Sequence, residues 1–143
     1  GDSEVLAWSV VRIGVVPFLE FCAARNIPFD ESVRERIDHA VRNAAYHIIE
    51  GKGATYYGVA SALAQLVEVI LRDERSIMTV CTPQNNIADV EDVTVAMPHV
   101  VGGNGIIGSH HPVKLADDEQ DKLHKSASLI KQMIVDLEAQ GDL

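Results

Sequence analysis

Several features that would define a function are scarce or absent in this sequence of 143 residues. It has two cysteines, Cys22 and Cys81, and neither lies in a CxxC pair or a Cys/His cluster, so neither a zinc site nor a disulfide framework is indicated. We expect two buried, reduced thiols, as in a cytoplasmic protein. No apolar run approaches the roughly 18 residues of a membrane span, and no signal peptide is recognisable.

Positive charge is also scarce. The chain has 12 lysines and arginines against 21 aspartates and glutamates, which gives a formal net charge of −9 and a pI of about 5.0. Such a surface repels phosphate backbones, so nucleic-acid binding is not expected. The hydrophobic fraction of 47% and the charged fraction of 23% are those of one ordinary globular domain with a core.

Known nucleotide-binding and hydrolase motifs are missing. The stretch GKGATYYG at residues 51–58 holds Lys52 between two glycines. A Walker A loop requires GxxxxGK followed by Ser or Thr, and a dinucleotide fingerprint requires GxGxxG, in both cases after a strand. No HExxH or GxSxG is present either. Because a predicted helix precedes these glycines, we interpret the stretch as a joint between two helices.

Three segments have the apolar spacing of three and four residues that is typical of amphipathic helices, at residues 30–50, 56–72 and 117–139. For the first helix we predict an N-cap at Asp30 and an end at Gly51 and Gly53. In the third helix, Asp117 can form a capping box with Gln120, three residues further on. The apolar positions of the three helices are Val33, Ile37, Val41, Ala44 and Ile48; Val59, Leu63, Leu66, Val67 and Ile70; and Leu123, Ala127, Ile130, Ile134 and Leu137.

The period changes between the second and third helices. Short strands are predicted at residues 76–81, 93–97 and 105–110, with a loop at 82–86 and a turn at 102–105. Near the N-terminus we expect an extended stretch at residues 5–13 and a short helix near 17–26. Consecutive strands with short turns favour antiparallel pairing. The sequence therefore predicts an α+β domain in which long helices pack on an antiparallel sheet.

The candidates for chemistry are few. Thr55, at the start of the second helix, has a hydroxyl that either caps free backbone N–H groups or faces an anionic substrate held at the helix N-terminus. Asp117, Asp118 and Glu119 are interpreted as capping residues rather than as a metal site. No histidine has the spacing of a metal ligand pair, and surface positions are expected for all of them: His39, His47, His99, His110, His111 and His124.

Five separated segments together resemble one family. They read GDSEVLAWS, NAAYHIIEGKGATYYGVASAL, ILRDERSIMTV, VEDVTVAMPHVVGGNGI and LADDEQDKLHKSASLIKQMI. In this order and spacing they resemble the C-terminal, substrate-binding half of NAD-dependent L-lactate dehydrogenases, whose nearest relatives are the malate dehydrogenases of the lactate-dehydrogenase-like type. The resemblance covers essentially residues 1–143, which would then form one C-terminal domain.

The resemblance implies that the functional site is shared with a segment that this sequence lacks. The family's first half is a Rossmann domain that binds most of the NAD, and its catalytic histidine is expected immediately before Gly1. Three residues carry over to this chain. Thr55 matches a substrate-pocket threonine, Ala45 a small pocket residue, and Val59 an aliphatic residue near the nicotinamide ring. Without the resemblance, Ala45 and Val59 would be taken for plain core residues.

The resemblance also implies the reaction and the partners. A threonine at position 55 favours pyruvate and L-lactate as substrates, whereas the alternatives are a malate dehydrogenase and a non-catalytic structural or oligomerisation module. The expected partners are the chain's own N-terminal half and further copies in a homotetramer. Without that half, the chain should expose apolar surface and tend to associate.

Two departures from the family pattern occur. The run TPQNNIADVEDV replaces a loop that usually contains glycine, and we expect it to change only an exposed turn. Ala116 stands where a capping serine is common, and we expect Asp117 to take over the cap.

Overall fold

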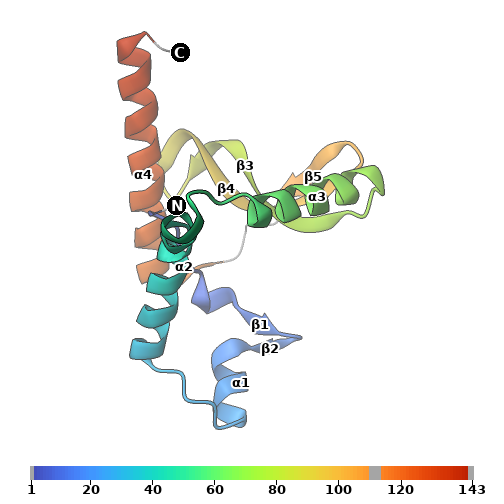
Figure 1. The fold of residues 1–143 in the computed structure, drawn as a ribbon, viewed down its shortest axis with the longest axis vertical. Coiled ribbons are helices and arrows are strands. Elements are labelled where there is room, and N and C mark those ends of the chain that lie inside the picture. Colours follow the sequence, from blue (N-terminus) through green and yellow to red (C-terminus); the bar gives the residue numbers. More distant parts are fainter. Residues whose placement is uncertain (1, 110–113, 142–143) are drawn as a thin grey trace.

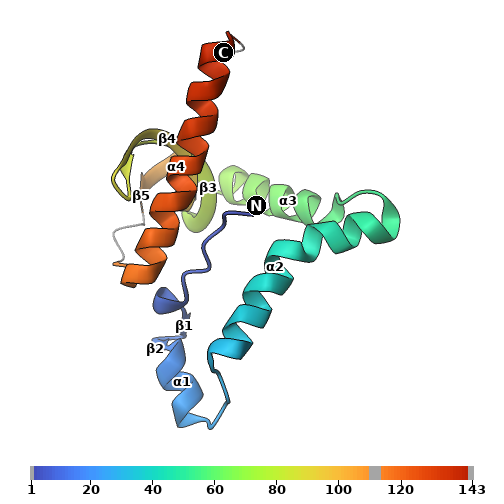
Figure 2. The same ribbon diagram turned by 90° about the vertical axis from the view of Figure 1, so that its left-hand side faces the viewer.

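The computed structural model describes residues 2–109 and 114–141, and it confirms the α+β class. In Figures 1 and 2 a long C-terminal helix lies against one side of a curved sheet, and the other helices extend away from this C-terminal helix. The elements in chain order are the 3-10 helix η1 (Trp8–Val10), β1 (Arg12–Ile13), β2 (Val16–Pro17), α1 (Phe18–Ala24), α2 (Glu31–Lys52), α3 (Tyr57–Leu71), β3 (Ser76–Ile87), β4 (Val90–Gly102), β5 (Gly105–Ser109) and α4 (Asp117–Gln140).

The boundaries of α2 follow from its caps. The Asp30 carboxylate accepts a hydrogen bond of 3.1 Å from the backbone N–H of Val33, as expected of an N-cap. The helix continues through Gly51, contrary to the prediction that this glycine helps to end it, and its last residue is Lys52. Gly53 ends it with a φ of 78°, a left-handed conformation that only glycine adopts without strain.

The N-terminus of α4 differs from the prediction. The N-cap residue is Ala116, not Asp117, and an alanine side chain cannot accept a hydrogen bond from the free N–H groups. The Ala116 N–H instead donates to the hydroxyl of Ser9, at 3.2 Å, and more weakly to the carboxylate of Glu119, at 3.4 Å. A residue 107 positions earlier in the chain thus supplies part of this cap.

The three-stranded sheet is a meander in the order β3-β4-β5, with both pairs antiparallel. Its first hairpin is longer than predicted, because residues 82–86 belong to β3 and not to a loop. The chain turns at Ala88 and Asp89, whose φ values of 50° and 64° are those of a tight primed hairpin turn. Pro83 is tolerated in β3 because this strand lies at the edge of the sheet.

The core lies between the sheet and α4. Val93 and Val95 of β4 are 2% and 5% exposed, and they pack with Ala127 of α4, which is completely buried. Burying a valine stabilises a fold by about 1.5–3 kcal/mol, so this contact fixes α4 on the sheet. Further members of this cluster are Val90, Ile87, Met97 and Ile130.

Residues 5–13 were predicted to be extended, but the 3-10 helix η1 interrupts this stretch before β1. An aromatic cluster holds it: the ring of Trp8 lies 5.9 Å from that of Phe18 and 5.1 Å from that of Phe29. The indole N–H of Trp8 also donates to the carboxylate of Asp38 on α2, at 2.9 Å. The segment is therefore anchored to α2 as well as to α4.

The two thiols have different surroundings. Both cysteines are free, as predicted, and Cys22 is buried in α1. Cys81 is exposed, which corrects the expectation that both are buried. Its position in β3 explains this, because exposed and less exposed residues alternate along that strand and Cys81 points to the open face of the sheet.

Candidate functional site

The joint between α2 and α3 holds the predicted site residue Thr55. In Figure 2 the two helices meet at the edge of the molecule that lies farthest from α4. Gly53 begins the turn with its N–H bonded to the carbonyl of Ile49, at 2.7 Å, and Tyr56 is the N-cap of α3. Thr55 is exposed and lies just before that cap. The glycine therefore reverses the chain and leaves the threonine at the surface.

Thr55 does not cap α3. The N-cap residue is Tyr56, and no side chain accepts a hydrogen bond from the first turn of this helix. Within the described part of the chain, the Thr55 hydroxyl makes no hydrogen bond, so it is available to a ligand or to another segment. The structure thus disfavours the capping interpretation of this residue.

Ala45 and Val59 are on the same two helices and are exposed. Ala45 belongs to α2, and Val59, in the first turn of α3, is 58% exposed. Neither residue packs in the core of this chain, so the core interpretation of both is wrong within the described residues. The side chains of Val59 and Thr55 are thus both accessible to another segment.

The start of the described chain lies on α2, against Arg42 and Tyr46. The backbone carbonyl of Asp2 accepts a hydrogen bond of 2.7 Å from Arg42, and its carboxylate oxygens lie 2.8 and 3.0 Å from the hydroxyl of Tyr46. This bond and the charge of the carboxylate raise the pKa of Tyr46 above its ordinary value, because both favour the protonated phenol. Asp2 is therefore held on this part of α2 by two side chains.

Two further contacts fix the N-terminal segment on α4. The Ser126 hydroxyl donates to that of Ser3, at 3.0 Å. Glu119, only 4% exposed, accepts hydrogen bonds from the Ser9 hydroxyl and, at 2.9 Å, from the Ser9 backbone N–H. Sequence reasoning placed Glu119 in the helix cap but missed Ser9, because no local signal links residues 110 positions apart.

Several large apolar side chains are uncovered along the lengths of α2 and α3. Leu71, at 81%, is the most exposed of their large apolar side chains among the described residues, although a lone domain of this size would bury much of such a face. This agrees with the expectation that the chain exposes apolar surface. The others are Val41, Tyr46, Ile48, Ile49, Tyr56, Tyr57, Val59, Leu63 and Val67.

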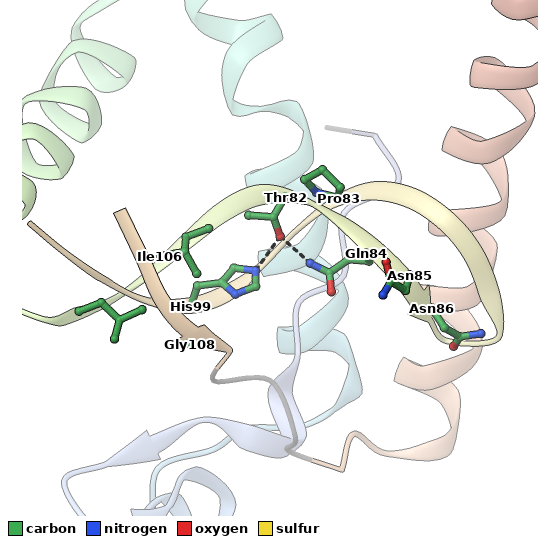
Figure 3. Close-up of a pocket in the computed structure, with 9 residues that line it drawn as sticks. Thr82, Pro83, Gln84, Asn85, Asn86, His99, Ile106 and Gly108 are labelled. Atoms are coloured by element: carbon green, nitrogen blue, oxygen red, sulfur yellow. Dashed lines mark hydrogen bonds between the residues drawn. The ribbon is translucent and has the colours of Figure 1, made fainter. Parts of the chain in front are cut away.

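A second concave site lies on the inner side of the curved hairpin, as Figure 3 shows. It is a cavity of about 440 Å³ where His99, Thr82 and Gln84 meet. His99 is 2% exposed and shares a hydrogen bond of 2.9 Å with the Thr82 hydroxyl, so it is not the surface histidine that was predicted. The spacing of two along β4 could have indicated this, because His99 has the same parity as the buried Val93 and Val95.

The other predictions about polar groups have mixed outcomes. His39, His47 and His124 are exposed, as predicted. The pair His110 and His111 lies outside the described residues. Within residues 2–109 and 114–141 there is no group of three or more His, Cys, Asp or Glu side chains that could hold a metal ion. In the same residues no helix is long and apolar enough to cross a membrane.

The structure is an α+β domain in which Ala45 of α2, Thr55 of the joint and Val59 of α3 are all exposed. The model of the lactate/malate dehydrogenase, alpha/beta C-terminal domain matches residues 1–140. This chain therefore belongs to the lactate/malate dehydrogenase family and contains its C-terminal domain.

Individual relatives agree with this family. The chain is 48% identical to an L-lactate dehydrogenase from Geotalea daltonii, over 94% of this chain and 42% of the relative. It is 47% identical to one from Deinococcus radiodurans, over 92% of this chain and 41% of the relative. The chain thus spans less than half the length of these curated relatives.

Solved structures share the fold. A lactate dehydrogenase enzyme from a Medee basin deep-sea metagenome library matches with a TM-score of 0.89 and 29% identity, over 96% of this chain and 44% of that one. The minor L-lactate dehydrogenase from Enterococcus mundtii matches with a TM-score of 0.83 and 32% identity, over 92% of this chain and 41% of that one.

Proposed function

We propose that this chain is the C-terminal, substrate-binding part of an NAD-dependent L-lactate dehydrogenase, which interconverts pyruvate and L-lactate in the intact protein. The observation that carries the proposal is the joint, where Thr55 is exposed and makes no hydrogen bond to another described residue. Asp2 is held on α2, the helix that bears Ala45. The relatives named above are L-lactate dehydrogenases and support the same reaction.

Each of the three residues has a role that its surroundings allow. The Thr55 hydroxyl would contact the bound 2-oxo acid, and Ala45 leaves room for that small substrate. Val59 is 58% exposed here and would keep water away from the reacting carbon once the partner lobe covers it. NAD, held mainly by the N-terminal half, supplies the hydride chemistry when it is bound.

The proton would come from outside this chain. A histidine directly before Gly1 would act as the general acid for the carbonyl oxygen of pyruvate. The contacts of Asp2 with Arg42 and Tyr46 hold Asp2 on α2, so in the proposed enzyme they would keep that histidine near α2. This makes the Asp2 contacts a positioning device in the proposed site.

The assembly and the cellular role belong to the same proposal. The uncovered apolar side chains on α2 and α3 would be buried by the N-terminal half and by further copies, which supports a homo-oligomer such as the expected tetramer. The reaction would regenerate NAD during glycolysis and pyruvate fermentation in the cytoplasm.

A hybrid protein tests the function. The N-terminal half of the Geotalea daltonii relative, ending with the residue that precedes its match to Gly1, is joined to this chain. We expect this hybrid to oxidise NADH with pyruvate at a higher kcat/KM than with oxaloacetate, whereas the reverse preference would indicate a malate dehydrogenase. A folded hybrid that binds NADH but reduces neither acid would contradict the proposal and favour a non-catalytic module.

The chain by itself provides the complementary test. Because the proton donor and most of the cofactor site are expected outside it, we expect no oxidation of NADH by the isolated 143-residue chain in the presence of pyruvate. The assay follows NADH absorbance at chain concentrations a hundredfold above those used for the hybrid. Turnover by the chain alone would overturn this division of roles.

A further inference from the structure

The joint that carries Thr55 is bridged by a cation and two aromatic rings. The ammonium group of Lys52 lies 4.3 Å from the ring centroid of Tyr56 and 4.5 Å from that of Tyr57. The two rings are themselves 4.7 Å apart at an interplanar angle of 60°. Both distances to the ammonium are well within the roughly 6 Å over which a cation is attracted to an aromatic face.

These three side chains come from both sides of the joint. Lys52 is the last residue of α2, Tyr56 is the N-cap of α3, and Tyr57 is its first residue. The contact therefore closes over residues 53–56 and brackets Thr55 in the sequence. A displacement of one helix end relative to the other would separate the ammonium group from the rings.

The backbone provides little else to fix this joint. The bond from the Gly53 N–H to the Ile49 carbonyl belongs to the end of α2, and the bond from the Ala60 N–H to the Tyr56 carbonyl belongs to the start of α3. Among the described residues, no hydrogen bond of the Thr55 side chain crosses between the helices. The lysine and the tyrosines make the side-chain contact that does.

Two simpler explanations account for only part of this arrangement. A lysine in the last turn of a helix interacts favourably with the helix dipole, but that requires no aromatic partner. Tyr56 and Tyr57 could be exposed only to be covered by another segment, but that requires no cation. The arrangement of all three groups is explained by a contact between them.

We propose that Lys52, Tyr56 and Tyr57 form a clamp that fixes the orientation of Thr55 toward the substrate. This inference rests on the proposed function, since Thr55 must contact the 2-oxo acid. The three clamp residues are positioning residues, because they act through the threonine. Their loss should affect pyruvate and leave NADH binding unchanged.

The test uses the hybrid dehydrogenase with Lys52→Met, which keeps an unbranched side chain one atom shorter and removes its charge. Exposed cation–π contacts to two rings predict a fall of about fivefold to thirtyfold in kcat/KM for pyruvate, mainly through a higher KM. Lys52→Arg, which retains a cation over the rings, should keep more than half of the activity. The KM for NADH should change less than twofold in both variants.

A matched control is available in the same chain. The guanidinium of Arg25 lies 5.5 Å from the ring centroid of Phe21 in α1, away from the joint. Arg25→Met removes a cation–π contact of the same kind, and we expect kcat/KM for pyruvate to change less than twofold. An equal loss in both variants would show that the effect is general and would overturn the clamp.

Coupling to Thr55 separates positioning from a structural role. If the clamp acts through the hydroxyl, Lys52→Met should cost less than a further twofold once Thr55→Val has been introduced. If the fold-losses in kcat/KM of the two single variants multiply in the double variant, the clamp is refuted. The two proposals can fail separately. A wild-type hybrid that is inactive on pyruvate would contradict the proposed function. A hybrid that is active and unaffected by Lys52→Met would overturn only the clamp.

Discussion

Replacing Glu119 should detach the N-terminal segment from α4. This carboxylate is 4% exposed and accepts hydrogen bonds from the Ser9 hydroxyl and backbone N–H, with a weaker contact to the Ala116 N–H. Glu119→Ala leaves the Ser9 N–H without an acceptor, at a cost of about 1–3 kcal/mol, and removes a charged hydrogen bond to the hydroxyl worth about 1.5–3 kcal/mol. The Ala116 N–H keeps the Ser9 hydroxyl as a partner.

We therefore expect Glu119→Ala to lower the free energy of unfolding by about 2–4 kcal/mol after partial replacement of the lost bonds by water. Glu119→Gln keeps one acceptor oxygen and should lose about half as much. With a urea dependence of about 1–3 kcal/mol per molar, the midpoint of unfolding should fall by roughly 1–2 M for the alanine variant.

Fluorescence provides a direct assay. Trp8 is the only tryptophan of the chain and is the neighbour of Ser9, so its emission reports on the docking of this segment. Asp121→Asn, which changes an exposed carboxylate two residues further along α4, serves as the control and should change the midpoint by less than about 0.3 M. Identical midpoints for Glu119→Ala and this control would show that the buried carboxylate does not hold the segment.

Two further predictions concern the contact between α3 and the β4–β5 turn. In Gly102→Ala the new Cβ would lie 2.6 Å from the Asp73 carboxylate and 2.6 Å from the Ile107 side chain, so calorimetry should show a loss of about 1–3 kcal/mol, whereas Gly108→Ala, whose Cβ meets nothing within 4 Å, should be close to neutral. The Gly103 N–H, 2.8 Å from Asp73, lowers the pKa of that carboxyl below its ordinary value of 3.8. The ionised Asp73 carboxylate therefore stabilises the fold fully above pH 3.8, and this stabilisation is lost as the pH falls through the lower pKa of the folded state. Asp73→Asn should consequently weaken the dependence of unfolding free energy on pH below about pH 4 and leave it unchanged near neutrality.

The long helices could be predicted because their signals are local. The caps at Asp30 and Gly53, together with apolar positions repeated every three or four residues, determine α2 almost completely. The turn at residues 102–105 was also predicted, because its glycines accept the backbone geometry that the β4–β5 hairpin requires. For such elements, nearby residues contain most of the information.

The missed features depend on residues far apart or on unusual local geometry. The β3–β4 turn uses Ala88 and Asp89 in the left-handed region without any glycine, so polar residues 82–86 were taken for the loop. The burial of His99 follows the alternation of Val93 and Val95, but its hydrogen bond to Thr82, 17 positions earlier, has no local signal. The roles proposed for Thr55, Ala45 and Val59 would require a lobe that this chain does not contain, and exposure alone does not assign them.

The order of the strands has a consequence for biosynthesis. The β3, β4 and β5 strands are consecutive and pair only with their neighbours in the meander, so the hairpins require no distant segment and should form soon after they leave the ribosome. The bond between Ser9 and Glu119 joins residues 110 positions apart and must wait for nearly the whole chain. Until then the N-terminal segment is not bound to α4. We therefore expect the nascent chain to remain sensitive to protease longest around Trp8 and Ser9.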